Sequence, residues 1–242
     1  AYDYTTASIV NESETEVILV GDSLGNVMLG LGDTVSVTME DMIHHGAAVA
    51  RGAKNALVVV DMPFMSYQSS VYDAVVNAGR LMKEARANAV KLEGGVEVTD
   101  RIRAIVDCQI PVCAHIGLTP QGINALGGFK VQGKTADSAR KLLEDAHAVE
   151  EAGAFAVVLE AIPAELAERV SAELTIPTIG IGAGAGCDGQ VLVIHDMLGI
   201  NKGFSPRFLR RYADLHTVMT GAVEQYVRDV KECDFPNEKE QY

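Results

Sequence analysis

The stretch NALVVVDMPF, residues 55–64, decides the fold class, because an unbroken apolar run leads directly into a carboxylate. Such a run is typical of a strand buried on both faces of a parallel sheet. A charge at the end of a buried strand costs free energy unless it is paired with an opposite charge or has a function. Four other runs end in charged or titratable residues: EVILVGDS at 16–23, NAVKLEGG at 88–95, IPVCAHIGLTP at 110–120 and AFAVVLEAIP at 154–163. These groups are expected to converge at one rim of the sheet.

Strand and helix patterns alternate along the chain. Two further apolar runs, near residues 176–181 and 191–195, bring the expected strands to seven. Amphipathic helical patterns lie at 38–52, 70–85, 98–108, 135–153 and 163–174, with two more at 206–215 and 216–232. The first of these helices has Thr38 as its N-cap and Gly52 as its stop signal.

This alternation predicts one α/β domain over residues 1–242 with a parallel sheet. Strand–helix units in this number indicate a (β/α)8 TIM barrel, whose active site lies at the carboxyl ends of the strands. A doubly wound open sheet is the alternative. Residues 206–232 are expected to be C-terminal helices and 233–242 a short exposed tail. The opening AYD, at 1–3, resembles the end of an eighth strand that starts upstream.

Composition excludes several classes of function. The net charge of -13 argues against DNA or RNA as a partner, because binding to the phosphate backbone needs a cationic surface. No apolar run approaches the roughly 18–20 residues that a membrane span needs, and the first residues lack a signal-peptide pattern. The four cysteines, Cys108, Cys113, Cys187 and Cys233, form no C-x-x-C pair and indicate reduced thiols of a cytosolic protein.

Two motifs match nucleotide-binding patterns without the structural context that those patterns require. GFKVQGKT, at 128–135, matches the Walker A pattern, but the residues before it are not a strand. GAGCDG, at 184–189, matches G-x-G-x-x-G, but a strand rather than a helix is expected after it. We therefore expect a surface loop that leads into a helix at the first motif, and a glycine-rich turn at the second, where an anion site stays open.

The charged strand ends point to a metal site. If Asp22, Asp61, Glu93 and Glu160 share a rim with Lys91, the local charge is about -3, and like charges at close range raise pKa values or need a cation. Ligation by carboxylate oxygens alone suits Mg²⁺ far better than Zn²⁺.

The histidines are less informative. His115 ends a strand and is often a structural group in such a position. His44 and His45 are adjacent within a helix pattern, so they cannot face one metal together and are interpreted as structural. His195 and Asp196 end the last apolar run and are candidates for residues that surround the site.

Seven motifs in order resemble the ketopantoate hydroxymethyltransferase family, from residue 1 to about residue 208. Single motifs would be weak, but seven in sequence are highly specific. They are VGDSLG, DMPFMSY, VKLEGG, VCAHIGLTPQ, GGFKVQG, VLEAIP and IPTIGIGAG…DGQVLVIHD.

The resemblance implies a fold and an activity. The fold is a TIM barrel of the phosphoenolpyruvate/pyruvate superfamily. The activity is transfer of a one-carbon unit from 5,10-methylenetetrahydrofolate to 3-methyl-2-oxobutanoate through a magnesium-stabilised enolate, which gives 2-dehydropantoate in pantothenate synthesis. Family members are cytosolic homo-oligomers, often decamers.

The resemblance also implies roles for particular residues. Asp22 and Asp61 bind Mg²⁺, Glu93 reaches the metal through water, and Glu160 is the general base. The positions that it assigns to substrate binding are Asp22, Ser23, Asp61, Lys91 and His115.

Two departures from the family pattern stand out. The family's N-terminal helix and most of its first strand are absent from this chain, and Arg86 replaces a small residue at a helix end. Candidate cations for a folate polyglutamate tail are Lys202, Arg207, Arg210 and Arg211. Two other functions stay open: a magnesium-dependent lyase or mutase acting on another 2-keto acid, and a barrel that binds a keto acid without turnover.

Overall fold

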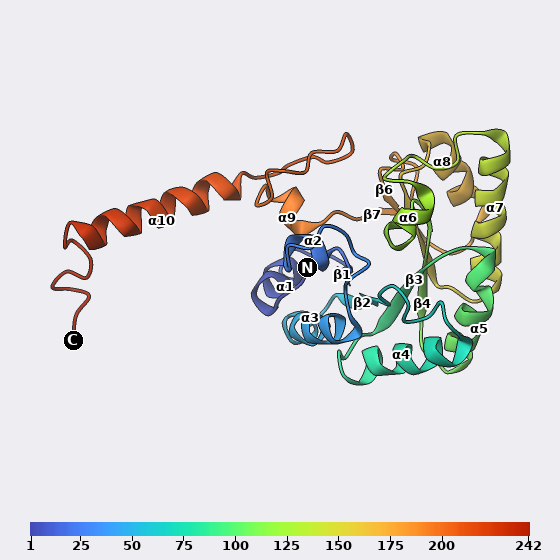
Figure 1. Ribbon diagram of the computed structural model, residues 1–242, viewed down its shortest axis with the longest axis horizontal. Helices are drawn as coiled ribbons and strands as arrows, with labels where there is room; N and C mark the ends of the chain where they lie inside the picture. Colours follow the sequence, from blue (N-terminus) through green and yellow to red (C-terminus); the bar gives the residue numbers. More distant parts are fainter. The chain divides into compact units, whose positions relative to one another are not determined.

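Seven parallel strands in sequential order form the central sheet of the computed structural model, which describes residues 1–242 (Figure 1). They are β1 Val17–Val20, β2 Leu57–Asp61, β3 Ala89–Glu93, β4 Val112–Gly117, β5 Ala156–Glu160, β6 Thr178–Ile181 and β7 Gly189–Gln190. Every neighbouring pair is parallel, so each connection must cross over and return the chain to the same end of the sheet. The sheet curls, with helices on its outer side, and this confirms the barrel-type fold (Figure 1).

The chain divides into two compact units, Ala1–Val191 and Leu192–Tyr242. The first unit holds the whole sheet. The second holds α9 Ile194–Met197 and α10 Leu215–Lys231, an amphipathic helix with no buried residue. No helix of the chain is both long enough and apolar enough to cross a membrane.

The face of the sheet turned away from the helices changes from apolar to charged along its strands. Residues two apart on a strand share a face, so Val59 lies below Asp61, and Ala89 below Lys91. The apolar layer is a buried cluster of Val59, Ala89, Cys113, Ala156 and Val158. This layer fills the barrel interior beneath the charged strand ends, and Cys113 is one of its core residues.

Six predicted helices are confirmed, with bounds shifted by a few residues: α3 Met39–Gly52, α4 Val71–Lys83, α5 Thr99–Asp107, α7 Ala136–Glu151, α8 Ala164–Glu173 and α10 Leu215–Lys231. Thr38 caps α3 as predicted and forms a capping box with Asp41. Ser70 and Thr135 cap α4 and α7 in the same way, through their side-chain oxygens.

Gly52 does not end α3 by adopting a left-handed conformation, as its predicted stop signal implied. It is the last helical residue, and it is buried where α3 packs against α1 Tyr4–Asn11. A Cβ atom on Gly52 would lie 2.5 Å from the Tyr4 carbonyl oxygen and 3.0 Å from the Ala7 Cβ. The glycine therefore permits the close approach of two helices.

Several short elements in the connections were not predicted, because one turn of helix leaves no periodic pattern. They are α2 Leu24–Val27, α6 Ile123–Leu126 and the 3₁₀ turns Val96–Val98 and Pro120–Gly122. All of them follow strands at their carboxyl ends, on the side of the charged residues.

Three expectations about strands and helices are wrong. No strand forms at 191–195, because β7 ends at Gln190 and the chain then turns into α9, where Val193 accepts hydrogen bonds from the Asp196 and Met197 N–H groups. Residues 206–214 form no helix, because Arg211 donates to the carbonyls of residues 201, 202 and 204 and holds this segment in a loop.

The opening AYD is also not a strand. Asp3 is the N-cap of α1, accepting from the Thr6 backbone N–H, and the Ala1 amino group donates to the Leu19 carbonyl of β1 over 3.0 Å. An N-cap aspartate stops the extended conformation at that point.

Both nucleotide-binding look-alikes behave as predicted. The segment 128–135 follows α6 rather than a strand and ends at Thr135, the N-cap of α7. The segment 184–189 leads into β7 rather than a helix. Neither has the strand–loop–helix arrangement of a phosphate-binding loop.

We predict opposite effects for alanine at two helical glycines. Gly52→Ala should lower the free energy of unfolding by about 1–3 kcal/mol, because the methyl group forces α1 away from α3. Gly79→Ala, in α4, should raise it by about 0.5–1 kcal/mol, because nothing lies within 4 Å of the new Cβ and alanine favours helix. Urea unfolding of both variants measures this, and shifts of the same sign would contradict the packing role of Gly52.

Candidate active site at the carboxyl ends of the strands

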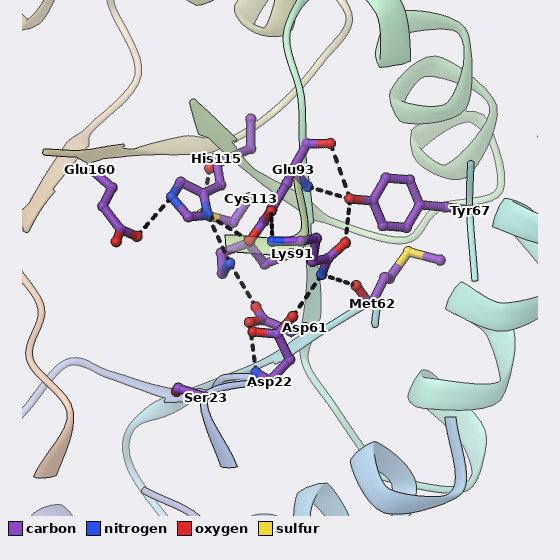
Figure 2. Close-up of polar contacts among 12 residues, drawn as sticks. Asp22, Ser23, Asp61, Met62, Tyr67, Lys91, Glu93, Cys113, His115 and Glu160 are labelled. Atoms are coloured by element: carbon purple, nitrogen blue, oxygen red, sulfur yellow. Dashed lines mark hydrogen bonds and ion pairs between the residues drawn. The ribbon is translucent and has the colours of Figure 1, made fainter. Parts of the chain in front are cut away.

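Charged side chains from neighbouring strands meet at the carboxyl ends of the sheet (Figure 2). The pairing register sets Asp61 beside Lys91 and Glu93 beside His115, so the groups face one another directly. Asp22 follows β1, and Glu160 ends β5. The predicted convergence of the five charged strand ends is thus realised within a single unit.

Lys91 and Asp61 form the central ion pair, with 2.9 Å between the lysine Nζ and Asp61 Oδ1 and both side chains 4% exposed. The other oxygen of Asp61 accepts a hydrogen bond from the Asp22 backbone N–H over 3.0 Å. Burial would lower the pKa of Lys91, but the Asp61, Glu93 and Asp22 carboxylates raise it above its usual value. Lys91 is therefore a permanent cation, and removing it would leave a buried carboxylate uncompensated.

His115 lies between two carboxylates. Its Nδ1 lies 3.4 Å from Glu93 Oε1 and 3.2 Å from the Lys91 amine, and its Nε2 lies 3.2 Å from Glu160 Oε2. Burial and Lys91 oppose protonation of the ring, but the contacts with Glu160 and Glu93 outweigh them and raise the pKa of His115 to about 9. The ring is therefore protonated at neutral pH, and its Nε2 contacts and orients the Glu160 carboxylate.

The protonated histidine changes the charge count of the site. Four carboxylates now face two cations, Lys91 and His115, which leaves a net charge of -2 when all four are ionised, rather than -3. Burial, then Asp61 and Glu93, hold the pKa of Asp22 well above its usual range. Burial also raises the pKa of Asp61, although Lys91 opposes this. A divalent cation would neutralise such a site.

The donor set fits Mg²⁺ through two carboxylates. Asp22 and Asp61 are side by side, whereas no group of three histidine, cysteine or acidic side chains converges closely enough to hold a metal alone. Mg²⁺ commonly takes one or two protein carboxylates and completes its shell with water and substrate. Glu93 is held instead by His115 and by the Gln121 backbone N–H, which suits a contact through water.

Glu160 is the most accessible carboxylate of the site. Its side chain is 17% exposed, against 4% for Glu93 and Asp61. Figure 2 shows it on the opposite side of His115 from Asp22 and Asp61. The imidazole of His115 therefore separates Glu160 from the other carboxylates.

Ser23 is half-buried beside Asp22, and its hydroxyl lies 2.8 Å from the hydroxyl of Tyr2. Tyr2 is 2% exposed, and its carbonyl oxygen contacts His45 Nδ1 at 2.7 Å. The structural interpretation of His45 is therefore confirmed, while Tyr2 is a neighbour of the site that the sequence pattern did not reveal.

Two buried polar residues of the site were also missed. Gln121 is 4% exposed and Tyr67 is 1% exposed, and the two are joined by a 2.8 Å hydrogen bond. Both lie in the quoted motifs, Tyr67 after β2 and Gln121 after β4, as polar residues in loops at the carboxyl rim. Their position at the carboxyl rim could have indicated a role in the site, but the pattern of charged strand ends does not include uncharged side chains.

Other predicted residues lie in the second unit. Asp196 is buried there, accepts from Asn201 Nδ2 over 3.1 Å, and has a pKa raised by burial. Lys202 donates to Thr217, and Arg211 donates to loop carbonyls, so both already have structural partners. Their roles toward folate, those of Arg207 and Arg210, and the role of His195 and Asp196 around the site stay predictions.

The curled parallel sheet, with its charged groups at the carboxyl ends of the strands, defines a protein with a TIM-barrel-like fold. The phosphoenolpyruvate phosphomutase from Streptomyces platensis subsp. rosaceus superposes with a TM-score of 0.62 at 17% identity, over 96% of this chain and 81% of that one. A 2,3-dimethylmalate lyase superposes with a TM-score of 0.59 at 17% identity, over 100% and 84%. Phosphonopyruvate hydrolase in complex with oxalate and Mg²⁺ gives 0.59 at 14% identity, over 99% and 86%.

The chain belongs to the ketopantoate hydroxymethyltransferase family, whose model matches residues 1–238. The 3-methyl-2-oxobutanoate hydroxymethyltransferase of Enterococcus faecalis (strain ATCC 700802 / V583) is 65% identical over 98% of this chain and 86% of its own length. That of Clostridium novyi (strain NT) is 63% identical over 99% and 87%. The comparisons therefore support an enzyme of this activity in pantothenate synthesis and confirm the family resemblance.

We predict that Asp22→Asn stabilises the metal-free protein at neutral pH. The pKa of Asp22 is higher in the folded state than in the unfolded state, so the folded protein holds the carboxyl proton more tightly. The stability that this proton provides is lost as the pH rises through the folded-state pKa. Asparagine removes that loss and can still accept from Gln121. The free energy of unfolding in EDTA should rise by about 0.5–2 kcal/mol, a usual gain when a strained functional residue is replaced.

The pH dependence provides the control for this prediction. The gain from Asp22→Asn should shrink toward pH 4, where the wild-type carboxyl is protonated in the folded state. Urea unfolding at pH 4 and pH 8 measures both values. A gain that is the same at the two pH values, or a loss at pH 8, would contradict the assigned cost of the Asp22 charge.

Proposed function

We propose that this site transfers a one-carbon unit from 5,10-methylenetetrahydrofolate to 3-methyl-2-oxobutanoate and forms 2-dehydropantoate. The observation that carries the proposal is the separation of Glu160, accessible and oriented by His115, from the paired carboxylates Asp22 and Asp61. One side of the site is suited to hold a chelated keto acid, and the other to remove its proton.

Mg²⁺ is proposed as the cofactor, held by Asp22 and Asp61, with Glu93 reaching it through water. When bound, it supplies a Lewis acid for the keto and carboxylate oxygens of the substrate. The net charge of -2 and the raised pKa values of Asp22 and Asp61 support a divalent cation here. Phosphonopyruvate hydrolase, which shares the fold, has been solved with oxalate and Mg²⁺.

Glu160 is proposed as the general base. Its carboxylate takes the proton from C3 of the keto acid, and the C–H electron pair becomes the C2–C3 double bond of an enolate. His115 holds one carboxylate oxygen, Oε2, at 3.2 Å and leaves the other for the proton. Positioned bases of this kind contribute roughly 10²–10⁴-fold to the rate.

The remaining residues are proposed to bind and orient the substrate. Lys91 and Ser23 lie next to Asp61 and Asp22, where a substrate carboxylate and keto group would be anchored, and Lys91 keeps its charge at any working pH. The enolate carbon then forms a bond to the methylene carbon of the folate as one of the two C–N bonds of that carbon breaks. Water replaces the second nitrogen and provides the oxygen of the new hydroxymethyl group. The proton taken from C3 and one proton of the water end on the two folate nitrogens, and tetrahydrofolate leaves.

The family resemblance also supports a homo-oligomer, which we propose to be a decamer in the cytoplasm. The stripe of exposed apolar residues along α10 favours self-association over a monomer. It contains Val218, Met219, Val223, Tyr226, Val227 and Val230. Light scattering of the purified protein would measure the particle mass.

We predict that formation of 2-dehydropantoate requires both Mg²⁺ and methylenetetrahydrofolate. Chelation by EDTA should abolish product formation, and added Mg²⁺ should restore it. Turnover of a keto acid without folate would instead indicate a lyase or mutase. Binding of 3-methyl-2-oxobutanoate without turnover, with folate and Mg²⁺ present, would indicate a barrel that only binds its ligand.

A second prediction tests the role of Glu160 as the general base. Glu160→Gln should slow exchange of the C3 proton of 3-methyl-2-oxobutanoate in D₂O by about 10²–10⁴-fold, because the amide cannot accept that proton. Magnesium-dependent binding of the keto acid should survive. The matched control is Glu165→Gln, exposed in the first turn of α8, which should exchange like the wild type. Unchanged exchange in Glu160→Gln would overturn the assignment.

A further inference from the structure

We propose that Gln121 is a positioning residue that orients the metal-site carboxylates, through direct hydrogen bonds to Asp22 and Glu93. This inference rests on the proposed role of Asp22 in holding Mg²⁺. Gln121 lies in the 3₁₀ turn Pro120–Gly122 after β4, and its side chain is directed into the site. Its side chain is a neutral amide, so it is neither a carboxylate ligand for a metal nor a general base.

Every hydrogen-bonding group of the Gln121 side chain is used. The amide nitrogen donates to Asp22 Oδ2 over 2.8 Å and to the Met62 carbonyl over 2.9 Å. The amide oxygen faces the Tyr67 hydroxyl at 2.8 Å and the Gln68 amide at 3.2 Å. The Met62 carbonyl can only accept a hydrogen bond, so the atom that faces it is the amide nitrogen, and the amide oxygen faces Tyr67 and Gln68.

The backbone of Gln121 acts on the second carboxylate. Its N–H donates to Glu93 Oε2 over 3.0 Å. One residue therefore holds one oxygen of Asp22 and one oxygen of Glu93, although the two carboxylates come from different strands. Gln121 also opposes the rise in the pKa of Asp22, because its hydrogen bond favours the charged form.

Tyr67 completes the connection between the two acidic residues. Its hydroxyl accepts from the Glu93 backbone N–H over 3.0 Å and lies next to Gln121 Oε1. The hydrogen bonds thus run from Glu93 through Tyr67 and Gln121 to Asp22, with every member buried. A buried network in which each group is satisfied holds its members in one arrangement.

A purely structural role would involve only the bonds to Met62, Gln68 and Tyr67, which join loops. The bonds to Asp22 and Glu93 differ, because they direct the carboxylates that are the proposed contacts for Mg²⁺ and its water. Residues that orient metal ligands typically change metal affinity by about 10–100-fold when removed. Metal affinity therefore distinguishes the two roles.

The experiment compares the full-length wild type with Gln121→Met, which keeps the length of the side chain and removes its polar atoms. Calorimetric titration with Mg²⁺ alone, in the absence of folate, measures the dissociation constant directly. Proton exchange at saturating Mg²⁺ then gives KM for 3-methyl-2-oxobutanoate. Thermal unfolding in EDTA checks that the variant is folded at the assay temperature.

The matched control is Gln109→Met. Gln109 is exposed after α5, at the amino end of β4, far along the strand from the carboxyl rim. Tyr67→Phe is the second variant, because it removes one hydroxyl from the network and leaves both carboxylates and Gln121 in place.

Gln121→Met should raise the Mg²⁺ dissociation constant by about 10–100-fold, with a much smaller change in KM once the metal saturates. Gln109→Met should match the wild type, and Tyr67→Phe should give an increase smaller than that of Gln121→Met. Wild-type Mg²⁺ affinity in a folded Gln121→Met protein would overturn the inference. If that variant does not fold, wild-type affinity in Tyr67→Phe would overturn it. A wild type that binds no Mg²⁺ would instead refute the proposed function.

Discussion

The buried ion pair between Lys91 and Asp61 is the contact on which the rest of the site depends. Two unpaired charges at this depth would each cost several kcal/mol, and removing one partner of such a pair commonly costs about 3–5 kcal/mol. Burial raises the pKa of Asp61, and Lys91 opposes that rise by stabilising the charged form of the carboxyl beside Asp22. A barrel that only needed to fold would place apolar side chains here, as it does one layer lower with Val59 and Ala89.

Around this pair, the cationic side chains offset only part of the negative charge of the four carboxylates. Contacts with two carboxylates keep His115 protonated, which reduces the negative charge, but burial and then repulsion by Asp61 and Glu93 still raise the pKa of Asp22. The residual charge matches a divalent cation, while the neutral hydrogen bonds of Gln121 orient the carboxylates without adding charge. Orientation and charge are therefore supplied by different residues.

The order of the strands and the main helices followed from the sequence, because buried runs such as 55–64 and caps such as Thr38 are local signals. Their five charged ends identified six residues of the site for the same reason. The failures occurred where a distant contact overrides the local pattern. Arg211 holds a helix-like segment as a loop, and Gly52 serves the close packing of α3 against α1 rather than a left-handed helix stop.

The sequence by itself determined which strands carry charge, and so the family and the class of metal that suits the site, because residue type and position along a strand are properties of the chain. Only the tertiary structure decided how those charges are shared. The proton on His115 and the junction formed by Gln121 and Tyr67 depend on distances between residues from different strands and loops. Such distances exist only after the sheet has curled and brought its carboxyl ends together.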